Sequence, residues 1–117
     1  MDGIIIVNKE PGYTSRDVVN IISKLLNTKK VGHTGTLDPS ASGVLVVCVG
    51  KALKICDMLI NHDKEYIADI ILGIETDTLD MDGKVLSTEN VDIEQKEIFD
   101  AVNSFKGYYL QEVPKYS

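Results

Sequence analysis

Residues 32–50 read GHTGTLDPSASGVLVVCVG, so a polar, glycine-rich stretch runs directly into an apolar one. The apolar part, from Val44 to Val49, is rich in β-branched residues and predicts a buried strand. The polar part carries one carboxylate, Asp38, whose backbone Pro39 restricts to extended conformations. The glycines that let the chain bend around it and let a large ligand approach are Gly32, Gly35 and Gly43. Such a bend is suited to presenting a nucleophile or a base.

The same stretch has more ordinary interpretations. Asp-Pro is a common opening of a turn, so Asp38 can also serve as a turn or cap residue. GHTG at 32–35 fits the GxxG loop of KH-type RNA-binding domains, but that loop joins two helices, whereas a strand is expected here. The Gly-Lys-Ser/Thr ending of a nucleotide-binding P-loop is missing. From the residues alone, the turn role is the main alternative to catalysis.

With 117 residues, 44% of them hydrophobic, the chain is one domain or part of one. No apolar run has the length of a membrane span, and the start does not read as a signal peptide. Cys48 and Cys56 are interpreted as reduced packing residues of a cytoplasmic protein.

Residues 1–54 hold seven Lys or Arg against four Asp or Glu, and residues 55–117 hold five against fourteen. This asymmetry predicts either a basic working face on the first half or a merely solvated acidic second half.

The apolar pattern predicts strands at 3–9, 44–50, 64–73 and 84–88, with a last extended piece at 108–113. Helices are expected at 15–28, 51–60 and 92–105, and a loop with at most a little strand at 28–43. Ser15 is the expected cap of the first helix and Gly107 the stop of the last. The residues expected to face inward from these two helices are Val18, Val19, Ile22, Leu25, Leu26, Ile98, Val102 and Phe105. Strands and helices without a regular βαβ rhythm indicate an α+β fold.

Residues 78–89, TLDMDGKVLSTE, match a calcium-binding EF-hand loop at five positions. The first position, however, is Thr78 rather than an aspartate, and the flanking segments predict strands instead of helices. His33 and His62 are isolated, with no third ligand at zinc spacing. Tyr66 is either a core aromatic or a platform for an unstacked base. We therefore expect no metal site and keep calcium binding as a minor alternative.

Four motifs, in order, resemble those of the bacterial tRNA pseudouridine-55 synthases of the TruB type. The most specific is GHTGTLDPSASGVL at 32–45. VNKEPGYTSRDVV at 7–19 resembles the Lys-Pro-x-Gly-x-Thr-Ser motif, with Pro11 one place late because Glu10 intervenes. KEYIADIILGIETDTLDMDG at 64–83 resembles the Lys-x-Tyr…Leu-Gly…Thr-Asp-Thr-x-Asp block. LQEVPKYS at 110–117 resembles the opening of the Gln-x-Pro-Pro-x-Tyr-Ser block, with Val113 in place of its first proline.

The resemblance implies isomerisation of uridine 55 to pseudouridine in the T loop of tRNA, with the target base flipped into a pocket and with neither a metal nor an organic cofactor. It implies that Asp38 is the catalytic carboxylate and that Tyr66 stacks on the base and takes part in proton transfer. Asp38 could attack the sugar, attack the base or remove a ribose proton, and the sequence does not choose among these. Further substrate contacts, with a supporting role for the lysine, are implied for Lys9, Gly32, His33, Thr34, Gly35 and Asp80.

The resemblance also implies a pseudouridine synthase catalytic fold, a mixed and mainly antiparallel sheet with flanking helices, of which residues 1–117 would be the N-terminal part. The rest of the catalytic domain, with an arginine that pairs with the aspartate, and any C-terminal RNA-binding domain would be absent. We expect such a fragment to be inactive alone and to self-associate. The full-length enzyme would be cytoplasmic and monomeric, with tRNA rather than a membrane as its partner. The alternative is an RNA-binding module without catalysis.

Overall fold

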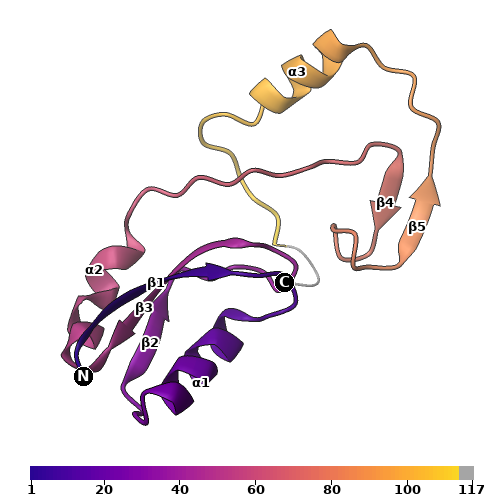
Figure 1. Ribbon diagram of the computed structural model, residues 1–117. Helices are drawn as coiled ribbons and strands as arrows, with labels where there is room; N and C mark the ends of the chain where they lie inside the picture. Colours follow the sequence, from indigo (N-terminus) through magenta and orange to yellow (C-terminus); the bar gives the residue numbers. More distant parts are fainter. Residues whose placement is uncertain (114–117) are drawn as a thin grey trace. The chain divides into compact units, whose positions relative to one another are not determined.

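The computed structural model describes residues 1–113 and forms two compact units, Met1–Glu65 and Tyr66–Ser117 (Figure 1). The final residues of the last predicted motif, Pro114 to Ser117, lie outside the described residues. Within residues 1–113, no helix has both the length and the apolar character needed to cross a membrane. Helices and antiparallel strands occur in both units, so the predicted α+β fold is confirmed.

A three-stranded antiparallel sheet forms the centre of the first unit, with the strand order β1-β3-β2. β1 is Gly3–Lys9, β2 is Val31–Thr34 and β3 is Gly43–Val49. The strands at 3–9 and 44–50 are thereby confirmed, and β2 is a short strand within the stretch predicted as a loop with at most a little strand. β3 is the central strand: Lys9 of β1 pairs with Gly43, and His33 of β2 pairs with Val47. The two ends of the glycine-rich stretch are therefore fixed by the same central strand.

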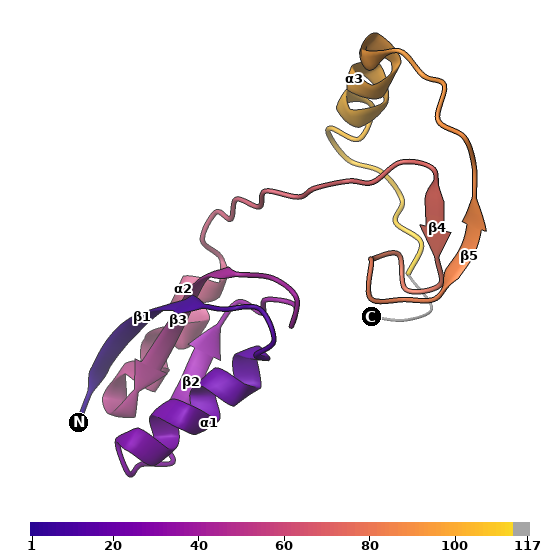
Figure 2. The same ribbon diagram turned by 45° about the vertical axis from the view of Figure 1, so that its right-hand side comes forward.

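Helix α1, Ser15–Leu25, lies along the sheet of the first unit (Figure 2). Its buried face and the inner residues of β3 form the core of this unit, made of Val18, Ile22, Leu45, Val47 and Val49. Leu25, expected to face inward, is instead 77% exposed. The cap also differs from the prediction: Thr14 is the N-cap, and its side chain accepts a hydrogen bond from the Asp17 N–H.

β3 is followed by a 3₁₀ helix, η1, at Gly50–Ile55 and by α2 at Cys56–Ile60, where the sequence predicted one short helix. Cys48 is buried and Cys56 half-buried, and both are free thiols. Burial, followed by the neighbouring Cys48, raises the pKa of Cys56 to about 11. Because the thiolate is the reactive form, this supports a packing role for Cys56 rather than a nucleophilic one.

The second unit holds a two-stranded antiparallel sheet and one helix. β4 is Ile74–Thr76, β5 is Val85–Thr88 and α3 is Gln95–Asn103. The strand at 84–88 is confirmed, and the helix at 92–105 is confirmed in shorter form. The prediction that Val102 and Phe105 face inward is wrong, since these side chains are 56% and 67% exposed.

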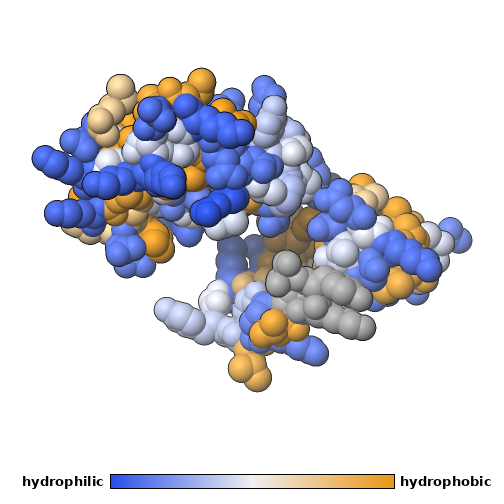
Figure 3. All heavy atoms as spheres, turned by 90° about the horizontal axis from the view of Figure 1, so that it is seen from below, coloured by the Kyte–Doolittle hydropathy of each residue, from blue (hydrophilic) through white to orange (hydrophobic). Residues whose placement is uncertain are grey.

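The strand predicted at 64–73 is wrong, because residues 63–71 have no regular secondary structure and 72–73 form a turn. Alternating apolar residues predict a strand, but a strand forms only when its backbone N–H and C=O groups find a neighbour. Here Ile67 and Ile70 are 95% and 74% exposed. The extended piece at 108–113 likewise joins no sheet. Figure 3 shows apolar residues, in orange, at the molecular surface.

Candidate active site

The connection between β1 and α1 holds the backbone that follows Asp38. The carbonyl of Pro39 accepts a hydrogen bond from the Gly12 N–H at 2.8 Å. Lys9, only 1% exposed, donates from Nζ to the same carbonyl at 3.4 Å, and also to the carbonyls of Tyr13 at 2.7 Å and Glu10 at 3.1 Å. A buried ammonium group needs its donors satisfied, and these three carbonyls satisfy them. Lys9 therefore acts on the bend through the backbone, and its buried ammonium group is bonded to the protein rather than exposed for the substrate contact that the resemblance implied.

The backbone that precedes Asp38 is held by the start of α1. The hydroxyl of Ser15 accepts a hydrogen bond from the Leu37 N–H at 3.1 Å and donates one to the Leu37 carbonyl at 3.3 Å. The side chain of Leu37 also packs against the core of the first unit. Residue 37 is thus fixed by its backbone and by its side chain.

Asp38 itself is exposed. Its carbonyl accepts a hydrogen bond from the Ala41 N–H at 3.0 Å, which closes a turn after Pro39. The backbone of Asp38 and Pro39 therefore does form the turn that Asp-Pro suggests. This turn is closed by the main chain of Asp38, so the carboxylate stays at the surface and is free for another role. The arrangement is a fixed backbone that presents an accessible carboxylate.

Other predicted site residues surround the same bend. His33, on β2, makes a 3.1 Å hydrogen bond from Nδ1 to the Gly35 carbonyl. A carbonyl only accepts, so Nδ1 carries the hydrogen and Nε2 is left for a second partner. Gly35 has φ +66°, a left-handed conformation that favours glycine, and a β-carbon there would lie 3.9 Å from Cε of Lys64. The positive side chain of Lys64 therefore reaches the bend.

Two residues of the motif serve packing. Thr34, the last residue of β2, is buried at 9% exposure. A β-carbon on Gly32 would meet Cδ2 of Leu53 at 2.8 Å, so Gly32 is needed for close packing against η1. The structure thus gives Gly32 a neighbour inside the protein, where the sequence suggested room for a ligand.

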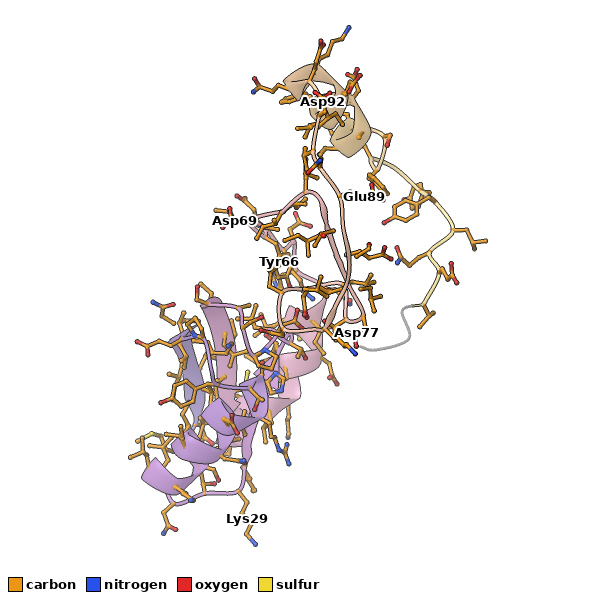
Figure 4. The ribbon with its side chains drawn as sticks, turned by 90° about the vertical axis from the view of Figure 1, so that its right-hand side faces the viewer. Lys29, Tyr66, Asp69, Asp77, Glu89 and Asp92 are labelled. Atoms are coloured by element: carbon orange, nitrogen blue, oxygen red, sulfur yellow. The ribbon has the colours of Figure 1, made fainter. Side chains whose placement is uncertain are left out.

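Tyr66 and Asp80 belong to the second unit. Tyr66 is 64% exposed on the segment between α2 and β4 (Figure 4), which supports an accessible ring but corrects its expected position on a strand. Asp80 lies in the turn between β4 and β5. A hydrogen bond from the Thr78 hydroxyl at 2.6 Å, followed by one from the Asp82 N–H, lowers the pKa of the Asp80 carboxyl from its ordinary value of 3.8.

The calcium-like turn is organised by its own hydrogen bonds. Besides the bonds to Asp80, Oδ1 of Asp77 accepts from the Lys84 N–H at 2.7 Å. Within residues 1–113, no group of three or more His, Cys, Asp or Glu side chains is placed to hold a metal ion. Asp80, one of the carboxylates that matched the EF-hand pattern, therefore serves as a turn acceptor, as does Asp77 just before the pattern.

Sequence reasoning missed the residues that hold the bend, namely Gly12, Ser15 and Leu37, and it missed Lys64, whose side chain lies near Gly35. One signal was available for Ser15: two hydroxyl residues, Thr14 and Ser15, stand together at the helix start, and only one can be the N-cap. The contact partner of the second hydroxyl, 22 positions away, could not be found from local pattern.

Solved structures show the same arrangement of elements. The chain is 29% identical to a chain of a Cbf5-Nop10-Gar1 complex, with a TM-score of 0.66, and the match covers 98% of this chain and 30% of that one. It is 28% identical to a chain of an archaeal box H/ACA sRNP Nop10-Cbf5 complex, with a TM-score of 0.62 over 93% of this chain and 30% of the other. The fold is that of part of a larger pseudouridine synthase domain.

The sequence model described as TruB family pseudouridylate synthase, N-terminal domain, matches residues 23–117. The chain belongs to this family. It is 52% identical to the tRNA pseudouridine synthase B of Alkaliphilus oremlandii and 51% identical to that of Clostridium tetani, and each match covers all of this chain. The chain spans 39% and 41% of the lengths of these relatives.

Proposed function

We propose that these residues form the aspartate-bearing part of an enzyme that isomerises uridine 55 to pseudouridine in the T loop of tRNA, with Asp38 as its catalytic carboxylate. The observation that carries the proposal is an exposed Asp38 whose neighbours on both sides, Leu37 and Pro39, are bonded to the β1–α1 connection. Membership of the family and the names of the relatives support the class of reaction and of substrate.

The reaction suits the groups that the site offers. In the target uridine the bond between C1′ and N1 breaks, a bond between C1′ and C5 forms, C5 loses a proton and N1 gains one. No electrons are gained or lost overall, so a carboxylate acting as nucleophile or base is chemically sufficient. The fixed bend contributes the orientation on which such a step depends.

The substrate must be brought to this carboxylate out of a folded RNA. A base inside RNA structure is out of reach and has to be flipped into the site. The exposed ring of Tyr66 provides a stacking surface for it. Nε2 of His33 and the ammonium of Lys64 provide polar and positive groups beside the bend for the RNA backbone.

The test uses an extended chain, defined as residues 1–117 followed by the remaining sequence of the Alkaliphilus oremlandii relative. A T stem-loop RNA carrying 5-tritiated uridine at position 55 releases tritium to water when pseudouridine forms. We expect release from this RNA, and none from an RNA in which the only labelled uridine stands elsewhere in the loop. Release without preference for position 55 would contradict the assignment of the substrate.

Asp38→Asn in the extended chain should lower the rate by roughly 10²-fold or more, because the amide is neither a nucleophile nor a base. RNA affinity should change little, since most of it comes from contacts to the phosphate backbone. A variant that keeps a substantial fraction of wild-type turnover would exclude Asp38 as the essential group. The 117-residue chain by itself should release no tritium, and any RNA binding that it shows would be that of a module without catalysis.

A further inference from the structure

We propose that the hydroxyl of Ser15 is a positioning group for Asp38, which fixes the backbone of Leu37 and thereby sets the direction in which the carboxylate leaves the bend. This inference rests on the proposed function of Asp38. It assigns to Ser15 a role distinct from the helix cap that its place in the sequence suggests.

The helix does not need the Ser15 hydroxyl. The capping box of α1 is complete without it: the Thr14 hydroxyl accepts from the Asp17 N–H at 2.9 Å, and Oδ2 of Asp17 accepts from the Thr14 N–H at 2.9 Å. Ser15 is the next residue, and its hydroxyl is directed to a segment 22 positions further along the chain.

Both hydrogen-bonding groups of Leu37 depend on that one hydroxyl. It accepts from the Leu37 N–H and donates to the Leu37 carbonyl, at 3.1 and 3.3 Å. Ser15 is 3% exposed, so water has little access to replace either bond. Removing the oxygen would therefore free the main chain of residue 37, which no strand or helix supports.

The two sides of Asp38 are held differently. After Asp38, the Pro39 carbonyl has two donors, the Gly12 N–H and Nζ of Lys9. Before Asp38, the backbone bonds of Leu37 converge on the single oxygen of Ser15. Loss of this oxygen would leave the Leu37 side of the bend held by side-chain packing alone, without its backbone bonds, while the Pro39 side keeps its two donors. The carboxylate would then turn about Pro39, and a misplacement of about 1 Å can lower a rate by roughly 10²-fold.

The experiment compares Ser15→Ala with Thr14→Ala in the extended chain. Thr14→Ala removes the neighbouring hydroxyl and weakens the same helix end, but the hydrogen bond that it removes is made with Asp17 rather than with residues 36–40. Single-turnover rates at saturating T stem-loop RNA and the RNA dissociation constant are measured at a temperature at which circular dichroism shows both variants folded. We expect Ser15→Ala to lower the rate by roughly 10- to 100-fold with unchanged RNA affinity. Thr14→Ala should keep the wild-type rate.

A second measurement does not depend on activity. Amide hydrogen exchange, followed by nuclear magnetic resonance, should show the Leu37 N–H protected in the wild type although it lies in a loop. Protection should be lost in Ser15→Ala and kept in Thr14→Ala. An unprotected Leu37 amide in the wild type would overturn the proposal even if Ser15→Ala failed to fold.

The outcomes separate this inference from the proposed function. A wild-type extended chain that forms no pseudouridine contradicts the proposed function, and the exchange data then decide alone whether Ser15 holds the bend. With an active wild type, equal rates for Ser15→Ala and Thr14→Ala would overturn the positioning role. So would a rate loss matched by an equal loss of RNA affinity, because Ser15 would then support binding instead.

Discussion

The two units of the chain differ in how far their own residues bury apolar side chains. In the first unit, Met1–Glu65, α1 and the three-stranded sheet enclose a core in which Leu45, Val47 and Val49 are fully buried. In the second, Tyr66 to Val113, Thr76 is the one residue that is buried among those described. Large apolar side chains there stay exposed, such as Ile67 at 95% and Leu110 at 100%.

The difference bears on function because Asp38 belongs to the first unit and Tyr66 to the second. The neighbours of Asp38 are held by contacts within the first unit: Pro39 by Lys9 and Gly12, and Leu37 by Ser15. The segment that carries Tyr66 has no sheet partner in the described chain. The relatives are about two and a half times as long, as their 39–41% coverage shows. The first unit thus holds the backbone around Asp38 through its own contacts, whereas the segment that carries Tyr66 has no such support from a sheet in the described residues.

The largest expected effect tests this contrast through stability. Leu45→Ala in the 117-residue chain should lower the free energy of unfolding by about 2–5 kcal/mol, because Leu45 is 1% exposed and its truncation leaves a cavity. Ile67→Ala should change it by no more than about 0.5 kcal/mol, because the side chain is already in water. Urea unfolding followed by circular dichroism measures both. Similar losses would show that residue 67 is buried in solution, and the contrast between the units would fail.

The next effect asks whether the second unit takes part in the chemistry. In the extended chain, Tyr66→Phe keeps the stacking ring and removes the hydroxyl, whereas Tyr66→Leu removes both. If the hydroxyl transfers a proton, Tyr66→Phe should lower the single-turnover rate by roughly 10²-fold. If only stacking matters, Tyr66→Phe should be nearly silent and Tyr66→Leu defective. Wild-type turnover by Tyr66→Leu would remove this residue from the site.

The same contrast explains what the sequence could predict. The apolar runs at 3–9 and 44–50 pair with each other inside the chain, and both became strands as predicted. The run at 64–73 has a similar pattern, but without a partner in the described residues it stays irregular. An apolar pattern shows that a segment can form a strand, but the strand forms only where a neighbouring strand pairs with it.

For the site, the chemical group was easier to predict than its support. Asp38 stood out as a single carboxylate among glycines, because the types of residue around it are visible in the sequence. The bonds from Ser15 to Leu37 and from Lys9 to Pro39 join residues 22 and 30 positions apart. Such contacts follow from how β1, α1 and β3 pack, and they cannot be predicted from the local spacing of residues.

The smallest effect concerns the turn between β4 and β5 of the second unit. Its Asp80 carboxylate accepts from the Thr78 hydroxyl and the Asp82 N–H, which lowers its pKa from 3.8. A group whose pKa is lower in the folded state stabilises that state above the unfolded value, and the contribution is lost as pH falls through the folded value. The turn should therefore keep its order at neutral pH and loosen only below pH 3.8.

Amide exchange at Asp82, followed against pH, measures this loosening after correction for the intrinsic pH dependence of exchange. Asp80→Asn keeps an acceptor oxygen but cannot titrate, so the acid-induced loss of protection should disappear, and protection should be weaker at neutral pH because the charge is gone. Asp92→Asn, outside the turn, is the matched control and should behave as the wild type. Added calcium should leave the exchange unchanged, since the carboxylate oxygens of Asp77 and Asp80 already accept hydrogen bonds within the turn. Protection that rises with calcium would contradict this account and restore a metal-binding role to the turn.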